Sequence, residues 1–165
     1  MIIKKIFFLI IFLLSLSVYP SNSIVAVIDE DIITLNQLNK LTKGAEKNQK
    51  MALLNLLIDE KIIQGVIAKL KIIPKETEIN RELNFIAKNN DVTLSDLSNS
   101  KEFPIILKRV EYELSKSILK KLVISEEKDT SNNKDLNLTD NQTFRNWIKK
   151  QREKIFIKIY EEKLN

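Results

Sequence analysis

The sequence lacks the side chains on which most enzymatic chemistry depends. It contains no histidine and no cysteine, so the usual general base near neutral pH, the thiol nucleophile and most transition-metal sites are excluded. Its two glycines, Gly44 and Gly65, are too far apart to form a phosphate-binding loop. We therefore predict a protein that is not an enzyme, with no catalytic residues, no bound metal and no cofactor.

Two local patterns still resemble chemical sites. Ser117 and Lys120 match the S-x-x-K pattern, in which a lysine one helical turn away activates a serine, but the partner motifs S-D-N and K-T-G are absent. The acidic residues 29–31 offer carboxylates, which calcium prefers, but a tight turn supplies few further ligands. We interpret the first pattern as part of an amphipathic helix and the second as a solvated turn.

The N-terminus has the three parts of a cleavable secretory signal peptide over residues 1–23. Two lysines form the positive start, an apolar stretch follows over residues 6–14, and Ser21 and Ser23 occupy the −3 and −1 positions of a cut before Ile24. The apolar stretch is too short for a bilayer, which takes about 20 apolar residues to span. The sequence thus predicts an exported protein with no stable membrane span after cleavage, and an uncleaved anchor is the alternative.

The mature chain has the size and charge of an ordinary single domain. Removing residues 1–23 from the 165 residues leaves 142, enough for one domain with one core. The same cut removes two lysines, so 25 basic residues remain beside 22 acidic ones and the net charge is +3. Because basic and acidic side chains alternate, we predict no binding to nucleic acid.

Apolar spacing predicts a mainly α fold: a multi-helix core with a short N-terminal β-hairpin and a C-terminal helix that packs back onto it. Two β-branched stretches, 24–28 and 32–34, flank a polar turn and predict the hairpin. Thr34 and Gln37 fit a capping box, so a helix should begin at Leu35.

The remaining helices follow from apolar stripes, capping residues and prolines. The stretch 49–70 is apolar on two stripes, which places it at the centre of the core. Pro74 opens the next helix, Thr93 with Asp96 caps a short turn, and Pro104 opens a long amphipathic helix. The apolar ridge of that long helix is predicted to be Ile106, Val110, Leu114, Ile118 and Leu122.

The chain divides into four segments. Residues 1–23 form the signal peptide, residues 24–124 a helical domain, residues 125–142 a polar linker, and residues 143–165 a C-terminal helix that completes the core. The last segment carries too much apolar and aromatic surface to remain in water, so it must dock on the preceding helices.

Apolar and aromatic side chains are in excess, and two interpretations of them stay open. They form the core, or some of them line a groove in which extended apolar polypeptide rests. The candidates for contacting such a polypeptide are Phe85, Phe103, Tyr112, Trp147, Phe156 and Tyr160.

Several stretches stand in a recognisable order along nearly the whole mature chain. They are residues 24–29 with 32–34, residues 53–63, Ile73 with 78–79, residues 86–90 with Thr93, Leu94 and Leu97, and residues 147–152 with 157–159. With the ending Trp-x-x-x-Gln-Arg, this order resembles the SurA family of periplasmic chaperones.

The resemblance implies a chaperone core without the family's catalytic domains. In the family, parvulin-type prolyl isomerase domains are inserted between the helical region and the C-terminal helix, and residues 125–142 are too few to hold one. The family commonly has a glycine before the fourth helix, where this chain has Asn99-Ser-Lys-Glu102, which puts any family contact there in doubt.

The function that the resemblance implies is that of an ATP-independent periplasmic holdase. It would bind unfolded or nascent outer-membrane proteins through an apolar groove and would have no isomerase activity. The alternative is a non-catalytic envelope subunit that uses the same helices to bind one dedicated protein partner.

Overall fold

Helices dominate the fold, which confirms the predicted fold class. The computed structural model describes residues 22–130 and 139–164, so residues 1–21 of the predicted signal peptide and residues 131–138 of the predicted linker lie outside this part. In chain order the elements are β1 (Ile24–Ile28), β2 (Asp31–Thr34), α2 (Leu35–Leu41), α3 (Lys47–Leu70), α4 (Glu76–Asn89), α5 (Leu94–Ser98), α6 (Phe103–Thr130), α7 (Asp140–Arg152), β3 (Ile157–Ile159) and the 3-10 turn η1 (Glu161–Lys163).

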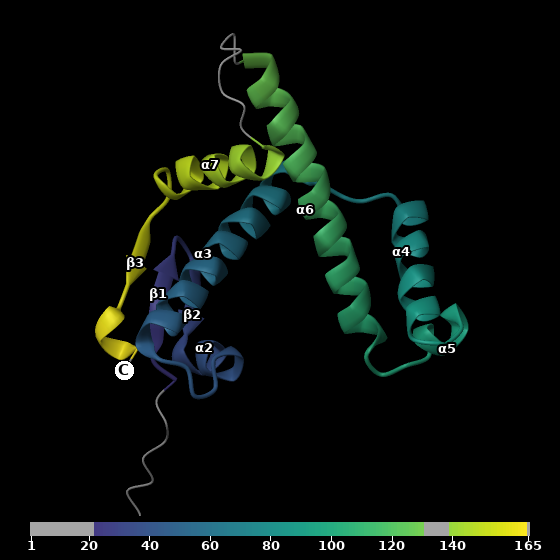
Figure 1. Cartoon of the computed structure of the whole chain (residues 1–165), viewed down its shortest axis with the longest axis horizontal. Helices are drawn as coiled ribbons and strands as arrows, with labels where there is room; N and C mark the ends of the chain where they lie inside the picture. The colour runs from purple at the N-terminus through teal and green to yellow at the C-terminus, as the bar shows by residue number, and fades with distance from the viewer. Residues whose placement is uncertain (1–21, 131–138, 165) are drawn as a thin grey trace, which may run out of the picture.

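The helix α3 lies at the centre of the fold, as its two apolar stripes predict. It contacts β1, α2, α6 and α7, and Figure 1 shows it between the sheet and α6. The capping boxes predicted at Thr34 and Thr93 are both present, and they start α2 and α5 at the expected residues.

The predicted β-hairpin is the first part of a three-stranded antiparallel sheet with strand order β2-β1-β3. Val27 of β1 faces Ile32 of β2 on one side and Lys158 of β3 on the other. The prediction of one helix over residues 143–165 is therefore wrong beyond Arg152. After Phe156, residues 157–159 alternate apolar and polar side chains, and the two apolar ones are β-branched isoleucines. This period of two suits a strand.

The predicted linker is shorter than residues 125–142. The helix α6 continues to Thr130, and α7 begins at Asp140, where Thr139 and Gln142 form a capping box. Across the gap, Lys150 of α7 lies 2.8 Å from a carboxylate oxygen of Glu127 of α6. The linker prediction was therefore wrong at both of its ends. At the first end the polar residues include good helix formers, two glutamates and a lysine, and at the second end the capping box starts a helix.

Three clusters of buried side chains replace the single predicted core. The first joins the sheet, α2, the first half of α3 and Leu164; the second joins the second half of α3 to α6 and α7; the third joins α4 and α5 to the first half of α6. Thus α6 belongs to two clusters and connects them (Figure 1).

The predicted ridge of α6 holds only over its first half. Val110 is buried, but Leu122 is 52% exposed, whereas Leu119 is 1% exposed. Residues four apart advance about 400° on a helix, so a ridge with that spacing turns by about 40° at each step. The ridge therefore rotates away from the partners that bury the second half of α6.

Two neighbouring carboxylates of α3 connect this helix to both of its large partners. Arg152 at the end of α7 donates from Nε to Asp59 Oδ1 at 2.7 Å, and from Nη2 to the backbone and side-chain oxygens of Asn55. On the α6 side, the Tyr112 hydroxyl and Lys116 Nζ donate to the two carboxylate oxygens of Glu60.

Removal of the Arg152 guanidinium should lower stability clearly. In Arg152→Met, the half-buried Asp59 carboxylate loses its partner, and we expect the free energy of unfolding to fall by about 2–3 kcal/mol in a urea titration. Lys150→Met on the same helix breaks an exposed ion pair with Glu127. This substitution should change the free energy of unfolding by less than about 1 kcal/mol. Equal effects of the two substitutions would contradict this role of Arg152.

Candidate functional site

The six predicted polypeptide-contacting residues do not gather in one place. Phe85 on α4 is 58% exposed, and Phe156 before β3 is similarly exposed. Phe103 packs partly buried against the cluster between α4 and α6. The ring of Tyr160 lies within cation-π distance of Lys158 and Lys163, on the sheet side of the molecule.

Two of the six belong to the interior of the fold. Trp147 stacks on Phe144 with ring centroids 5.4 Å apart, and both pack in the cluster between α3, α6 and α7. Tyr112 packs on the same cluster and donates its hydroxyl to Glu60. These two side chains hold helices together, so the exposed members of the set are Phe156 and Phe85, and Phe85 stands on a helix that borders a cleft.

That neighbouring cleft lies between α4 and α6 and has a volume of about 490 Å³. We call it the α4–α6 cleft. Its apolar lining is formed by Ile86, Ile106, Val110 and Leu114, and its charged lining by Glu82, Arg109 and Glu113. The volume falls in the range of ligand pockets, about 300–1,000 Å³.

Two exposed apolar side chains flank the α4–α6 cleft. At about 100° per residue, Phe85 lies about 60° round α4 beyond Glu82, and Ile105 lies about 40° round α6 beyond Arg109. Ile105 is 72% exposed. Each of these side chains therefore lies outside the cleft lining, beyond a charged lining residue on its own helix. Sequence reasoning missed Ile105, although its place directly after Pro104, at the start of a helix, was a signal.

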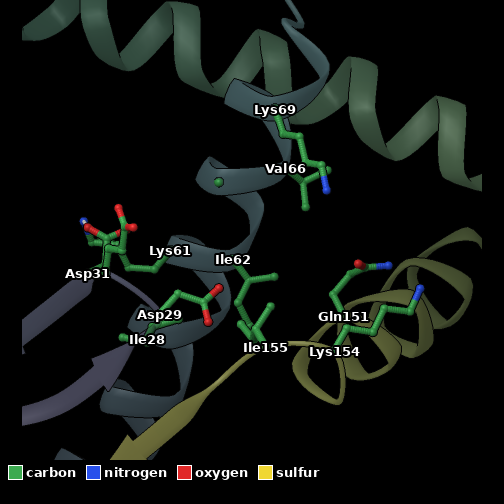
Figure 2. A pocket seen from close by; sticks show the side chains of 12 residues that line it. Ile28, Asp29, Asp31, Lys61, Ile62, Val66, Lys69, Gln151, Lys154 and Ile155 are labelled. Atoms are coloured by element: carbon green, nitrogen blue, oxygen red, sulfur yellow. Dashed lines mark hydrogen bonds and ion pairs between the residues drawn. The ribbon is translucent and has the colours of Figure 1, made fainter.

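A second cleft, of about 620 Å³, lies where the hairpin turn, α3 and the end of α7 meet. We call it the hairpin cleft. Figure 2 shows Ile62 of α3 beside Ile155, with Val66 further along α3, and these three and Ile28 form its apolar lining. Gly65 also lines this cleft. Sequence reasoning interpreted residues 29–31 of this lining as a solvated turn and missed the cleft, because the lining comes from three distant segments.

The two weak chemical patterns have ordinary structural partners. Lys120 Nζ donates to Asn141 Oδ1 of α7 at 2.6 Å, whereas Ser117 is exposed. In the acidic turn, Asp29 accepts a hydrogen bond from the Phe156 amide at 2.9 Å, and Asp31 pairs with Lys61 at 3.1 Å. Within residues 22–130 and 139–164, no group of three carboxylates could hold a metal ion.

Comparisons with known proteins do not assign the chain to a family. No model of a known protein family matches the sequence, and no curated protein matches it significantly. The resemblance to the SurA family therefore stays a prediction. In the part of the chain that the structure describes, no helix combines the length and the apolar character that crossing a membrane requires.

The half-buried phenol of Tyr112 should make the protein sensitive to alkali. Burial, followed by the hydrogen bond to Glu60, raises the pKa of Tyr112 above its ordinary value of 10.0. Above that pH the unfolded chain loses this proton while the folded chain retains it, so stability falls as pH rises. We expect Tyr112→Phe to unfold more easily at pH 7, by about 1–2 kcal/mol, and to lose less stability between pH 9 and pH 11.

Tyr160→Phe provides the control for this titration. Among the described residues the Tyr160 hydroxyl has no hydrogen-bond partner, and the ring lies at the surface beside two lysines. This variant should keep the alkaline loss of stability of the original protein, measured by chemical unfolding at each pH. The assignment to Tyr112 fails if both substitutions change the pH dependence equally.

Proposed function

We propose that the protein is an exported, ATP-independent holdase that binds unfolded outer-membrane proteins in the periplasm, without catalysing a reaction. The observation that carries this proposal is the pair of exposed apolar side chains, Phe85 and Ile105, on the two helices that form the partly apolar α4–α6 cleft. Exposed apolar surface beside a cleft is typical of a binding site for another polypeptide.

The placement of this surface suits a binding role. Figure 1 shows α4 and α5 beside the first half of α6, away from the sheet and α7. The two clusters around α3 bury their own apolar side chains. A polypeptide on the α4–α6 cleft therefore does not compete with the contacts that hold α3, α7 and the sheet together.

The amount of apolar surface favours weak and reversible binding. Complete burial of a Phe or Ile side chain stabilises a complex by about 1.5–3 kcal/mol. Two such contacts together stabilise a complex by about 3–6 kcal/mol, which corresponds to dissociation constants from about 40 μM to several millimolar. The entropy lost on association weakens binding further. Weak binding of this kind allows clients to leave without ATP hydrolysis.

The contact between two of the resemblance motifs supports the proposed relation to the SurA family. Asp59 lies in the stretch 53–63, and Arg152 is the last residue of the Trp-x-x-x-Gln-Arg motif. Their side chains form an ion pair. The chain thus builds its central module from an early helical region and a late helix. That is the arrangement that the resemblance implies.

The alternative function is binding to one dedicated envelope partner. The charged lining of the α4–α6 cleft, with Glu82 and Glu113 beside Arg109, favours it because fixed charges suit a partner with complementary charges. A pull-down from envelope extract distinguishes the two functions. Many unfolded clients support the holdase, and one stoichiometric partner supports the alternative.

Loss of the two exposed side chains should weaken holdase activity. We expect the protein at modest molar excess to suppress light scattering by an unfolded outer-membrane barrel, and Phe85→Ser with Ile105→Ser to lose most of that suppression. The matched control is Leu41→Ser with Leu56→Ser, because these leucines are 64% and 60% exposed and lie outside the cleft. Absence of suppression by the original protein, or equal loss in both double variants, would refute the proposal.

Export should remove the segment that precedes β1. In the structure the Ser23 carbonyl accepts from the Leu35 amide at 2.7 Å, and Asn22 Oδ1 accepts from the Asn36 amide at 3.3 Å. A cut before Ile24 removes both bonds from the start of α2, whereas a cut before Asn22 keeps them. Mass spectrometry of the exported protein should find an N-terminus within a residue or two of Ile24, and a species that begins at Met1 would contradict cleavage.

A further inference from the structure

Gly65 lies inside the 24-residue helix α3, five residues before its end, where no packing contact requires a glycine. A Cβ atom at this position would have no heavy atom within 4 Å, and its φ angle is not in the left-handed region. Glycine inside a helix is less stable than alanine, by about 1 kcal/mol in helix propensity. The absence of a side chain instead keeps open the hairpin cleft, which Gly65 lines.

Charges of opposite sign lie at opposite sides of the hairpin cleft. Figure 2 shows Asp29 and Asp31 on one side, and Lys69, Gln151 and Lys154 on the other. On the acidic side, Asp31 pairs with Lys61 and Asp29 accepts from a backbone amide, and Glu30 adds a third carboxylate to the lining. Among the described residues, neither Lys69 nor Lys154 has a carboxylate within ion-pair distance.

We propose that the hairpin cleft binds the free C-terminal carboxylate of a polypeptide whose last residues are apolar. The carboxylate would lie between Lys69 and Lys154, with the Gln151 amide as a further donor. The apolar side chains that precede it would cover Ile62, Val66 and Ile155 and fill the space above Gly65.

This inference rests on the proposed binding of polypeptides and adds a specificity to it. The ammonium groups of Lys69 and Lys154 lie beside apolar lining. They therefore favour a ligand that has an anionic end and an apolar body. Inorganic phosphate meets only the first requirement. The acidic residues across the cleft favour a ligand whose negative charge is confined to one end, because carboxylates repel a second anionic group.

The size of the cleft fits this ligand. A volume of about 620 Å³ is within the range of small-ligand pockets and accommodates a few residues at the end of a chain. Capture of a C-terminal carboxylate is an established mode of peptide recognition. The two lysines supply it here by charge, since an ammonium group forms strong hydrogen bonds to a carboxylate.

The test compares two peptides that differ only at the last group. A six-residue peptide with an N-terminal fluorophore and three C-terminal leucines is prepared with a free carboxylate and with a C-terminal amide. Fluorescence anisotropy with the purified protein should show binding of the acid at least about tenfold tighter than the amide. The preference should shrink in high salt and in the double variant Lys69→Gln with Lys154→Gln.

A substitution at Gly65 tests the place of binding without disturbing the fold. Gly65→Phe puts a ring into the cleft and should weaken binding of the acid peptide at least about tenfold, with a melting temperature at or above that of the original protein. Gln64→Phe is the control, because Gln64 is exposed on the same helix and outside the cleft lining. It should leave peptide binding unchanged.

Each outcome separates this inference from the proposed function. Equal binding of acid and amide, or equal effects of Gly65→Phe and Gln64→Phe, overturns the carboxylate site, whereas suppression of barrel aggregation that depends on Phe85 and Ile105 is unaffected by either result. Displacement of the acid peptide by laurate but not by an unlabelled acid peptide would identify a fatty-acid site and overturn the inference as well. Loss of aggregation suppression with an intact acid preference refutes the holdase alone.

Discussion

The adjacent carboxylates Asp59 and Glu60 are the contacts on which the arrangement of helices depends. Neighbours on a helix point about 100° apart, so one turn of α3 presents two acceptors in two directions. Arg152 of α7 takes the first, and Tyr112 and Lys116 of α6 take the second. Apolar packing alone tolerates sliding of one helix past another, but directional, charge-assisted hydrogen bonds fix the register of both partners on α3.

The shared helix α6 then transmits this register to the rest of the chain. Its middle and its second half are fixed on α3 and α7, while its first half carries α4 and α5. The contacts that stabilise the fold around α3 are thereby separate from the part with exposed apolar side chains, which is formed by α4, α5 and the first half of α6. A binding surface on this part can expose Phe85 and Ile105 without loss of the buried contacts around α3.

Elements that depend on residues close in sequence were predicted well, and the strand that depends on a distant partner was not. The capping boxes at Thr34 and Thr93 and the two-striped helix α3 depend on residues close in sequence, and the structure confirms them. The strand β3 was missed because three residues of alternating pattern have little weight beside a preceding amphipathic helix, and only pairing with distant β1 makes them a strand.

The candidate sites followed the same division. Phe85, Tyr112 and Trp147 were all candidates by residue type, with a place in the core left open. Hydrogen bonding and stacking use Tyr112 and Trp147 within the fold, whereas Phe85 is exposed. The hairpin cleft was not predictable, because its lysines and its glycine come together only when three segments meet.

The central position of β1 also determines the order in which the chain can fold. Its two neighbours in the sheet are β2, which follows it directly in the chain, and β3, which comes near the end of the chain. The hydrogen bond from the Phe156 amide to Asp29 in the hairpin turn joins residues 127 apart in the sequence. Contacts of such separation form late, because a long loop must close first. In a chain that crosses a membrane N-terminus first, the sheet stays two-stranded and marginal until the final segment has emerged. Completion of the fold would then coincide with completion of export, and a chain halted in transit would leave one edge of β1 open.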